Sequence, residues 1–175
     1  MGQHNSHEAL ALRWAALCND PALRDLPYKI ELNAFGTIEM SPASTRHARL
    51  QAAMAFQLAL HLPHGVVLTE CPVATDEGVR VPDVAWASAE FAARHGDATP
   101  LPQAPEICVE VRSPSNSNEE MAMKTRAYLG AGAVEVWELS EGGTLKIFNV
   151  HGLQAASSFG VEIVVPGAVP GAVPR

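Results

Sequence analysis

The sequence predicts an α/β (α+β) domain in which a mixed β-sheet is flanked by helices. Short apolar runs that end at Gly, Pro or Ser alternate with segments whose apolar residues recur at helical spacing. Their order along the chain is helix, hairpin, helix, strands, helix, strands, which is typical of helices packed on a sheet. With 175 residues, 47% of them hydrophobic, the chain is long enough to bury one substantial core.

Two serines mark helix starts in the first half of the chain. Ser6 and Ser44 each precede an apolar pattern of helical period and are expected to cap it. Between the two helices, an alternating run turns at Asn33–Gly36 and pairs back on itself. The expected elements are a helix, a hairpin, a longer helix and a strand, at residues 7–18, 28–40, 45–61 and 66–71.

The second half alternates strands with two further helices. Asp76, Glu77 and Gly78 are expected to form a hairpin turn. A polar, proline-containing loop is expected at 96–104. The expected strands are 79–87, 107–111, 134–137, 145–150 and 161–165, and the expected helices are 89–95 and 118–129.

Domain organisation follows from these elements. We expect an N-terminal helical extension at 1–26, a single domain at 27–165 and a flexible Pro/Gly tail at 166–175. The tail repeats the letters GAVP and contains three prolines and two glycines, so no regular element is predicted there.

Charge and cysteine content limit the classes of function. A formal net charge of -7 argues against a general nucleic-acid coat, although a nuclease can gather acids at a metal site and hold phosphates locally. The three scattered cysteines suit a reducing compartment. No signal-peptide pattern and no apolar run of membrane-spanning length are found, so a cytoplasmic protein that does not enter the membrane is expected.

Two acids interrupt apolar runs that read as buried strands. Asp83 follows Val81-Pro82, and Glu110 lies between Val109 and Val111. A buried carboxylate is costly unless a metal ion or a lysine pairs with it. Carboxylates on adjacent strands could hold a hard cation, with the Val111 carbonyl as a third ligand. For either acid alone, the better interpretation is a strand end or a solvent-facing residue.

Five other side chains are candidates for the same site. Lys124, on the predicted helix 118–129, could steady charge on a phosphate, or could simply pair with Glu120 on a solvated face. Glu31 is a candidate for a further metal ligand, and Arg112 is a candidate for binding phosphate. His47 and Tyr128 are candidates for contacts with the substrate. Each also has an ordinary structural interpretation, as a solvent-facing strand residue, a surface ion pair, a helix-start histidine or a packing tyrosine.

An ordered set of short motifs resembles the Uma2 family of bacterial proteins, which are described as endonucleases with a PD-(D/E)xK restriction-endonuclease-like fold. In this chain the set is Glu31-Leu32, Gly36, Ser41-Pro42, His47, Pro82-Asp83-Val84, Glu110-Val111-Arg112-Ser113-Pro114-Ser115, Lys124, Tyr128, Gly132 and Glu135-Val136-Trp137. The resemblance covers roughly residues 28–150, and its specificity comes from the order of the motifs rather than from any single one.

The resemblance implies a restriction endonuclease-like core and a site that uses Mg²⁺ (or Mn²⁺). Asp83 would be the acid of the PD motif and Glu110 the acid of the (D/E)xK motif. Arg112 stands at the usual lysine position, and the lysine would be Lys124 on the following helix. Unlike lysine, arginine cannot readily give up a proton, so Arg112 would stabilise charge rather than act as a base. DNA as substrate and a homodimer are implied as well.

Two functional hypotheses remain from the sequence. The first is a divalent-metal-dependent DNA endonuclease that hydrolyses phosphodiester bonds. The alternative is a catalytically weak or inactive nuclease-fold protein that acts as a nucleic-acid-binding or protein-interaction module. Convergence of Asp83 and Glu110 on one point near Lys124 is the structural requirement of the first hypothesis.

Overall fold

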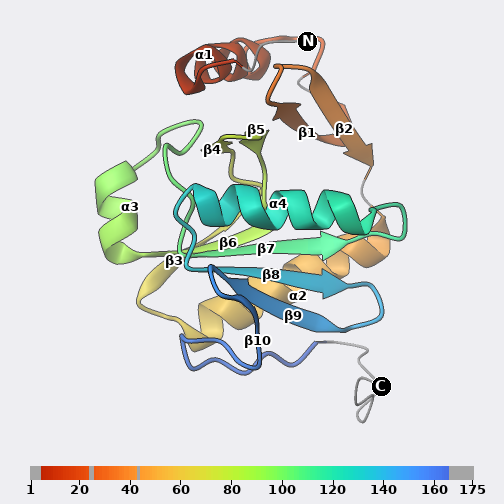
Figure 1. Ribbon diagram of the computed structural model, residues 1–175, viewed down its shortest axis with the longest axis vertical. Helices are drawn as coiled ribbons and strands as arrows, with labels where there is room; N and C mark the ends of the chain where they lie inside the picture. The colour runs from red at the N-terminus through yellow and green to blue at the C-terminus, as the bar shows by residue number, and fades with distance from the viewer. Residues whose placement is uncertain (1–4, 24–25, 43, 166–175) are drawn as a thin grey trace.

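The computed structural model describes residues 5–23, 26–42 and 44–165, which form four helices and ten strands. Figure 1 shows their arrangement. The helices are α1 (His7–Cys18), α2 (Thr45–His61), α3 (Ala89–His95) and α4 (Asn118–Gly130). The strands are β1 (Tyr28–Asn33), β2 (Ile38–Pro42), β3 (Gly65–Thr69), β4 (Val73–Thr75), β5 (Gly78–Arg80), β6 (Val84–Ser88), β7 (Ile107–Arg112), β8 (Glu135–Ser140), β9 (Leu145–Asn149) and β10 (Gly152–Gln154).

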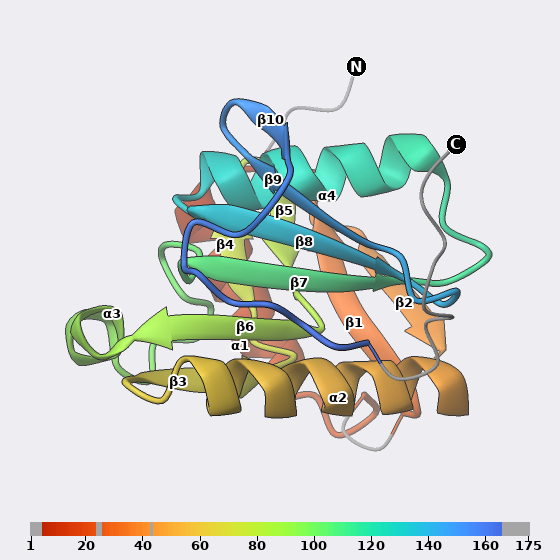
Figure 2. The same ribbon diagram turned by 90° about the horizontal axis from the view of Figure 1, so that it is seen from below.

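A six-stranded sheet of order β10-β9-β8-β7-β6-β3 forms the centre of the molecule. Strands β7 and β8 are parallel, and the other neighbours are antiparallel, so the sheet is mixed, as predicted. Helix α4 makes the crossover between the two parallel strands. Figure 2 shows α4 on one face of this sheet and α2 on the other.

Alternation along β7 decides which side chains meet which helix. Ile107, Val109 and Val111 point to the α2 side, where they pack with residues such as Leu50, Met54 and Leu58. Cys108 points to the α4 side and packs with Tyr128. Glu110 shares this parity, so the strand itself directs the carboxylate toward α4.

A smaller antiparallel sheet of order β2-β1-β5-β4 stands beside the α4 side of the large sheet. Helix α1 covers it through a compact apolar cluster made of Leu10, Trp14, Leu32, Val79 and Val81. The predicted helix at 7–18 therefore forms with the predicted bounds and packs on this sheet. Ser6 caps it, since its hydroxyl accepts a hydrogen bond from the main-chain N–H of Ala9 at 3.2 Å.

The chain changes sheets where the sequence predicted one continuous strand at 79–87. Strand β5 ends at Arg80 and β6 begins at Val84, so Asp83 lies between two strands and not within one. Pro82 explains the break, because proline has no N–H to donate to a neighbouring strand. The correction matters for the site, since the crossing places Asp83 where the two sheets meet.

The predicted strand at 161–165 is also wrong. Those residues form no strand, and the edge of the large sheet is instead the short β10. Val161, Ile163 and Val165 still alternate inward and pack against the apolar cluster on the α2 side. The 166–175 segment, predicted as a tail, lies outside the described residues. Among the described helices, none is long and apolar enough to cross a membrane.

Candidate active site

Glu110 lies near the end of β7 with only 4% of its surface exposed. Its Oε1 accepts a hydrogen bond from the Tyr128 hydroxyl at 2.6 Å. Its Oε2 lies 3.5 Å from the ammonium groups of both Lys124 and Lys29. The costly burial of this carboxylate is therefore offset by two cations and one hydroxyl donor.

Asp83 is held just before β6 with 1% of its surface exposed. The main-chain N–H of Val111 donates to its Oδ2 at 2.7 Å, which ties the aspartate to β7 one residue after Glu110. Its Oδ1 lies 2.7 Å from Lys29 Nζ and 3.3 Å from His47 Nε2. Both oxygens of this carboxylate are thus occupied by partners from other elements.

His47 reaches Asp83 from the first turn of α2. Ser44 caps that helix as predicted, because its hydroxyl accepts a hydrogen bond from the main-chain N–H of His47 at 3.0 Å. The cap fixes where the helix begins and so where the His47 ring stands.

Glu31 belongs to the same cluster through Lys124. The Lys124 ammonium lies 3.0 Å from Glu31 Oε2, closer than its 3.5 Å distance to Glu110. The main-chain N–H of Val81 donates to Glu31 Oε1 at 2.8 Å. The central strand β1 of the small sheet and helix α4 therefore meet at a buried lysine held between two glutamates.

The charges of the cluster set the pKa of each member. Although burial alone would raise the pKa of Asp83, Lys29 and His47 hold it well below its ordinary value. Burial opposes the charge on Lys124 and Lys29, but the neighbouring carboxylates raise the pKa of both amines. Burial raises the pKa of Glu110, and Asp83 and Glu31 add to it against the two lysines. Both lysines therefore carry their protons at neutral pH.

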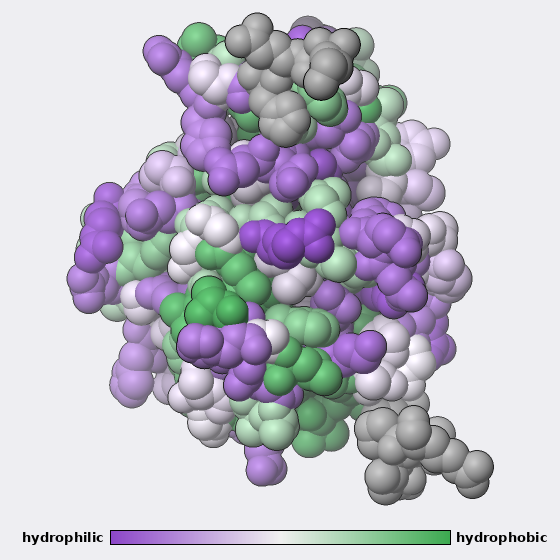
Figure 3. All heavy atoms as spheres, in the orientation of Figure 1, coloured by the Kyte–Doolittle hydropathy of each residue, from purple (hydrophilic) through white to green (hydrophobic). Residues whose placement is uncertain are grey.

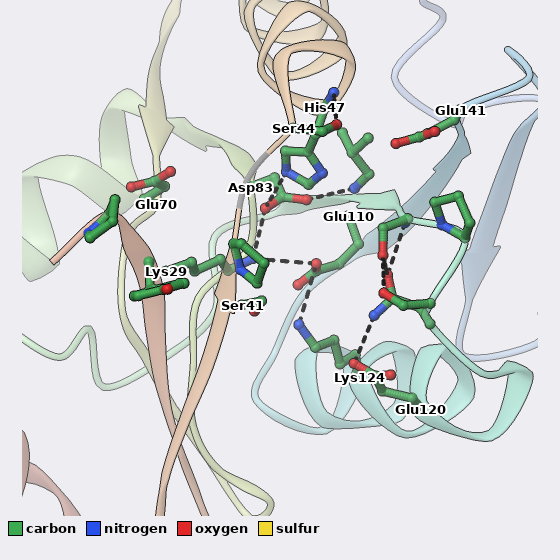
Figure 4. Close-up of a pocket in the computed structure, with 18 of the residues that line it drawn as sticks. Lys29, Ser41, Ser44, His47, Glu70, Asp83, Glu110, Glu120, Lys124 and Glu141 are labelled. Atoms are coloured by element: carbon green, nitrogen blue, oxygen red, sulfur yellow. Dashed lines mark hydrogen bonds and ion pairs between the residues drawn. The ribbon is translucent and has the colours of Figure 1, made fainter.

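A pocket of about 400 Å³ between the two sheets, α2 and α4 is lined by five members of the cluster, Lys29, His47, Asp83, Glu110 and Lys124. Figure 4 shows Lys29, His47 and Lys124 reaching the carboxylates of Asp83 and Glu110 from three separate elements. The main chain of Val111 and the turn at 113–116 form another part of the wall. Three further acids also line the pocket, Glu70, Glu120 and Glu141.

Lys29 is the member of the cluster that sequence reasoning missed. A signal for it exists, because Lys29 and Glu31 are two apart on β1 and so point to the same face. The spacing that makes Glu31 a candidate therefore applies equally to the lysine two residues before it. The Lys29 side chain is 12% exposed and contacts both predicted acids.

Arg112 is not brought to this pocket, although it follows Glu110 by two residues on the same strand face. Its guanidinium donates to the Asn116 carbonyl at 3.1 Å, and its side chain lines a second pocket of about 700 Å³. That pocket lies between α4 and the strands β8 to β10, where Figure 3 shows apolar and polar side chains side by side. Its lining includes Arg126, Lys146 and Phe148.

The donors in the first pocket are of the kind that Mg²⁺ prefers. No three His, Cys, Asp or Glu side chains gather as a metal-binding group within the described residues. Magnesium, however, is commonly held by one or two carboxylates and keeps several waters. Asp83 Oδ1 and Glu110 Oε2 face one common point, where both contact Lys29 Nζ. The two predicted acids therefore converge, and the residues fit a hard cation.

Comparisons with known proteins identify a family and a similar fold. The model of the Uma2 family, described as "Putative restriction endonuclease", matches residues 17–172. No curated protein gives a significant match. A solved structure from Anabaena variabilis ATCC 29413, described as "a putative nuclease belonging to DUF820", is similar with a TM-score of 0.57 and 16% sequence identity. The similarity covers 74% of this chain and 82% of that one, and at this identity it speaks for the fold alone.

Proposed function

This chain belongs to the Uma2 family, and from that premise we propose that it is a divalent-metal-dependent DNA endonuclease that hydrolyses phosphodiester bonds. One observation carries the proposal: a buried carboxylate on β7 and another just before the neighbouring strand β6 converge with two lysines in a single pocket. Structural ion pairs also perturb pKa values, but here the two acids and the two lysines line the same pocket.

Asp83 and Glu110 would hold Mg²⁺ or Mn²⁺ through their carboxylates. The Val111 carbonyl and Glu31 are the further candidate ligands: Val111 lines the pocket, and Glu31 reaches the cluster through Lys124. When bound, such an ion polarises the scissile phosphate and lowers the pKa of an attacking water.

The chain's own residues orient this site. Tyr128 fixes one Glu110 oxygen by its hydrogen bond, so that the other oxygen faces the pocket. His47 holds Asp83 Oδ1 from the opposite side and stands where it can contact a bound substrate. Lys124 carries a positive charge beside Glu110, and in our proposal it steadies the negative charge that develops on the phosphate.

A cleavage assay with matched variants tests the function. The purified protein is incubated with plasmid and linear DNA in the presence of Mg²⁺ or Mn²⁺, beside Asp83→Asn and Lys124→Ala. We expect cleavage by the unaltered protein and at least a roughly hundredfold loss in each variant, as removal of a charge-stabilising group commonly produces. Cleavage that persists in both variants would show that the activity belongs to another site or to a contaminant.

A second candidate is a weakly active or inactive module that binds nucleic acid or protein. The observation that favours it is the saturation of the acids, since the Asp83 and Glu110 oxygens already have partners within the chain. The pocket also carries Glu70, Glu120 and Glu141, which repel phosphates. DNA binding by fluorescence anisotropy, without cleavage under any metal condition, would favour the module over the enzyme.

The homodimer belongs to the same proposal, because two copies would be needed to cut both strands of a duplex together. Analytical ultracentrifugation with and without a short DNA duplex measures it. We also propose a cytoplasmic location, because free cysteines suit a reducing compartment. The free cysteines are Cys18, Cys71 and Cys108.

A further inference from the structure

We infer that Lys29 occupies the point between Asp83 and Glu110 that a divalent cation would take, so that its ammonium and the metal compete for the same two carboxylates. The inference rests on the proposed function insofar as those acids are taken to be the metal ligands. The inference adds Lys29, which lies outside the family motifs, to the site. It also means that a metal ion binds by replacing the Lys29 ammonium.

The position of the ammonium is the first support. Lys29 Nζ lies 2.7 Å from Asp83 Oδ1 and 3.5 Å from Glu110 Oε2, the two oxygens that face a common point. A magnesium ion sits about 2.0–2.1 Å from its oxygen ligands. Because the ammonium contacts both oxygens, an ion that came close enough to be held by the same two oxygens would compete with it for them. Two cations cannot share that space, so the ammonium must leave when the ion enters.

The charge of the cluster is the second support. Glu31, Asp83 and Glu110 bring three negative charges, and Lys29 and Lys124 bring two positive ones; Arg80, 3.7 Å from Glu31 Oε2, adds a third positive charge. All six side chains are largely or wholly shielded from water. Next to Asp83 and Glu110, the two lysines thus supply compensation that a metal would otherwise provide. A metal that enters with both lysines in place would face extra repulsion at short range.

The two lysines differ in what they block. Lys124 bridges Glu31 and Glu110 and does not contact Asp83, so it lies beside the common point rather than in it. Lys29 alone contacts both predicted metal ligands from the PD and (D/E)xK motifs among the described lysines. Lys124 is therefore a matched control, since its loss removes the same charge from Glu110 without vacating the point between the acids.

A partner for the displaced Lys29 ammonium lines the same pocket. Lys29 lies on β1 at the wall of the pocket, on a flexible four-carbon stem, and Glu70 lines the same pocket. Figure 4 places Glu70 on the Lys29 side of the pocket, away from Lys124. We assign Glu70 as the partner that receives the displaced ammonium, which keeps its charge compensated after the exchange.

Titration of the protein with Mn²⁺ alone tests the exchange without any substrate. The bound fraction is measured from the loss of the electron paramagnetic resonance signal of free Mn²⁺. We expect Lys29→Met to bind Mn²⁺ at least about tenfold more tightly than the unaltered chain, because the occupied point is vacated. Lys124→Met should gain less than about threefold, because only the general repulsion is relieved. Lys29→Arg, which keeps a cation at the point, should bind no more tightly than the unaltered chain.

Equal gains for Lys29→Met and Lys124→Met, or no gain for Lys29→Met, would overturn the inference. Thermal unfolding covers the case in which Lys29→Met folds poorly, because the acids then lack their counter-ion. Recovery of a cooperative transition on adding Mn²⁺ would support the exchange, and failure to recover would contradict it.

DNA cleavage by the same variants is measured separately. Tighter binding by Lys29→Met with no DNA cleavage by any variant would support the exchange and contradict the nuclease function.

Discussion

Tyr128 donates a hydrogen bond from its hydroxyl to Glu110 Oε1 at 2.6 Å, and both side chains are almost completely shielded from water. Burial raises the pKa of the Tyr128 hydroxyl well above its ordinary value, so the hydroxyl keeps its proton and donates to the carboxylate at neutral pH. The tyrosine predicted as a substrate contact therefore acts first as the support of a carboxylate.

Replacing Tyr128 with phenylalanine leaves Glu110 Oε1 buried without its donor. We expect the free energy of unfolding to fall by about 1–3 kcal/mol, the usual cost of one orphaned buried polar group. Urea denaturation measures the change. Tyr28→Phe is the matched control, since Tyr28 is 45% exposed and its loss should change stability by less than about 0.5 kcal/mol. Equal effects of the two substitutions would contradict the support role.

Glu135 gives a pH-dependent prediction away from the pocket. Its carboxylate accepts hydrogen bonds from the Ser158 N–H and hydroxyl, the Ser157 hydroxyl and the Trp137 indole at 2.6–2.8 Å. Burial alone would raise the pKa of Glu135, but these donors hold it below its ordinary value of 4.5. The stabilisation is therefore complete above pH 4.5 and is lost as the pH falls through the lower pKa of the folded state.

We expect Glu135→Gln to be clearly less stable than the unaltered chain at pH 7, and the difference to shrink as the pH falls below 4.5. The amide cannot accept on its nitrogen, so two of the four donors lose their partner. Denaturant unfolding at several pH values measures this, with the exposed Glu162→Gln as control. A difference that stays constant from neutral to strongly acidic pH would argue that packing, and not the charge, is what matters.

Gly65 is required where β3 passes β6. A Cβ at this position would lie 2.4 Å from the Ala87 carbonyl oxygen and from the Trp86 ring. Because the main chain cannot give way easily, we expect Gly65→Ala to destabilise the protein by about 1–3 kcal/mol, measured as a lower midpoint in urea. Gly130→Ala is the control, since a Cβ added there would meet no atom within 4 Å and alanine favours the helix. If Gly65→Ala lowers the free energy of unfolding no more than Gly130→Ala does, β3 and β6 can move apart to accept the Cβ without loss of stability.

Arg112→Ala tests whether the arginine at the usual lysine position matters for chemistry. Its guanidinium is turned to the Asn116 carbonyl and to the second pocket, so we expect DNA cleavage to fall by only a few fold. Lys124→Ala should lose at least a roughly hundredfold factor in the same assay. Initial rates at saturating Mg²⁺ measure both. A loss for Arg112→Ala as deep as that for Lys124→Ala would place the arginine at the substrate.

Alternation along β7 accounts for one part of the site. Period-two spacing directs Glu110 to the face covered by the helix that carries Lys124 and Tyr128, and the structure joins all three. The family motifs, and not local spacing, assigned Asp83, Glu31 and His47 to one site, and the structure brings them into one cluster. Their separation in the sequence says nothing of their distance in space.

The departures have physical causes in single residues. Pro82 interrupts the strand expected at 79–87, because it lacks the N–H that a ladder requires. Residues 161–165 alternate as a strand would, but their apolar side chains bury against the core without strand pairing. Lys29 escaped notice because an isolated lysine in a hairpin strand is normally solvated, and only the meeting of the two sheets buries it.

The pairing of β6 with β7 means that the site is divided between two halves of the sequence. Lys29, Glu31, His47 and Asp83 precede the exposed segment 96–98, and Glu110 and Lys124 follow it. Strand β6 pairs with β7 across this division through Val84↔Val109, Ala85↔Cys108 and Trp86↔Ile107. A chain cut at 96–98 would yield two fragments, each with part of the cluster. Their reassembly would restore the pocket, so the protein offers a ready scaffold for fragment complementation.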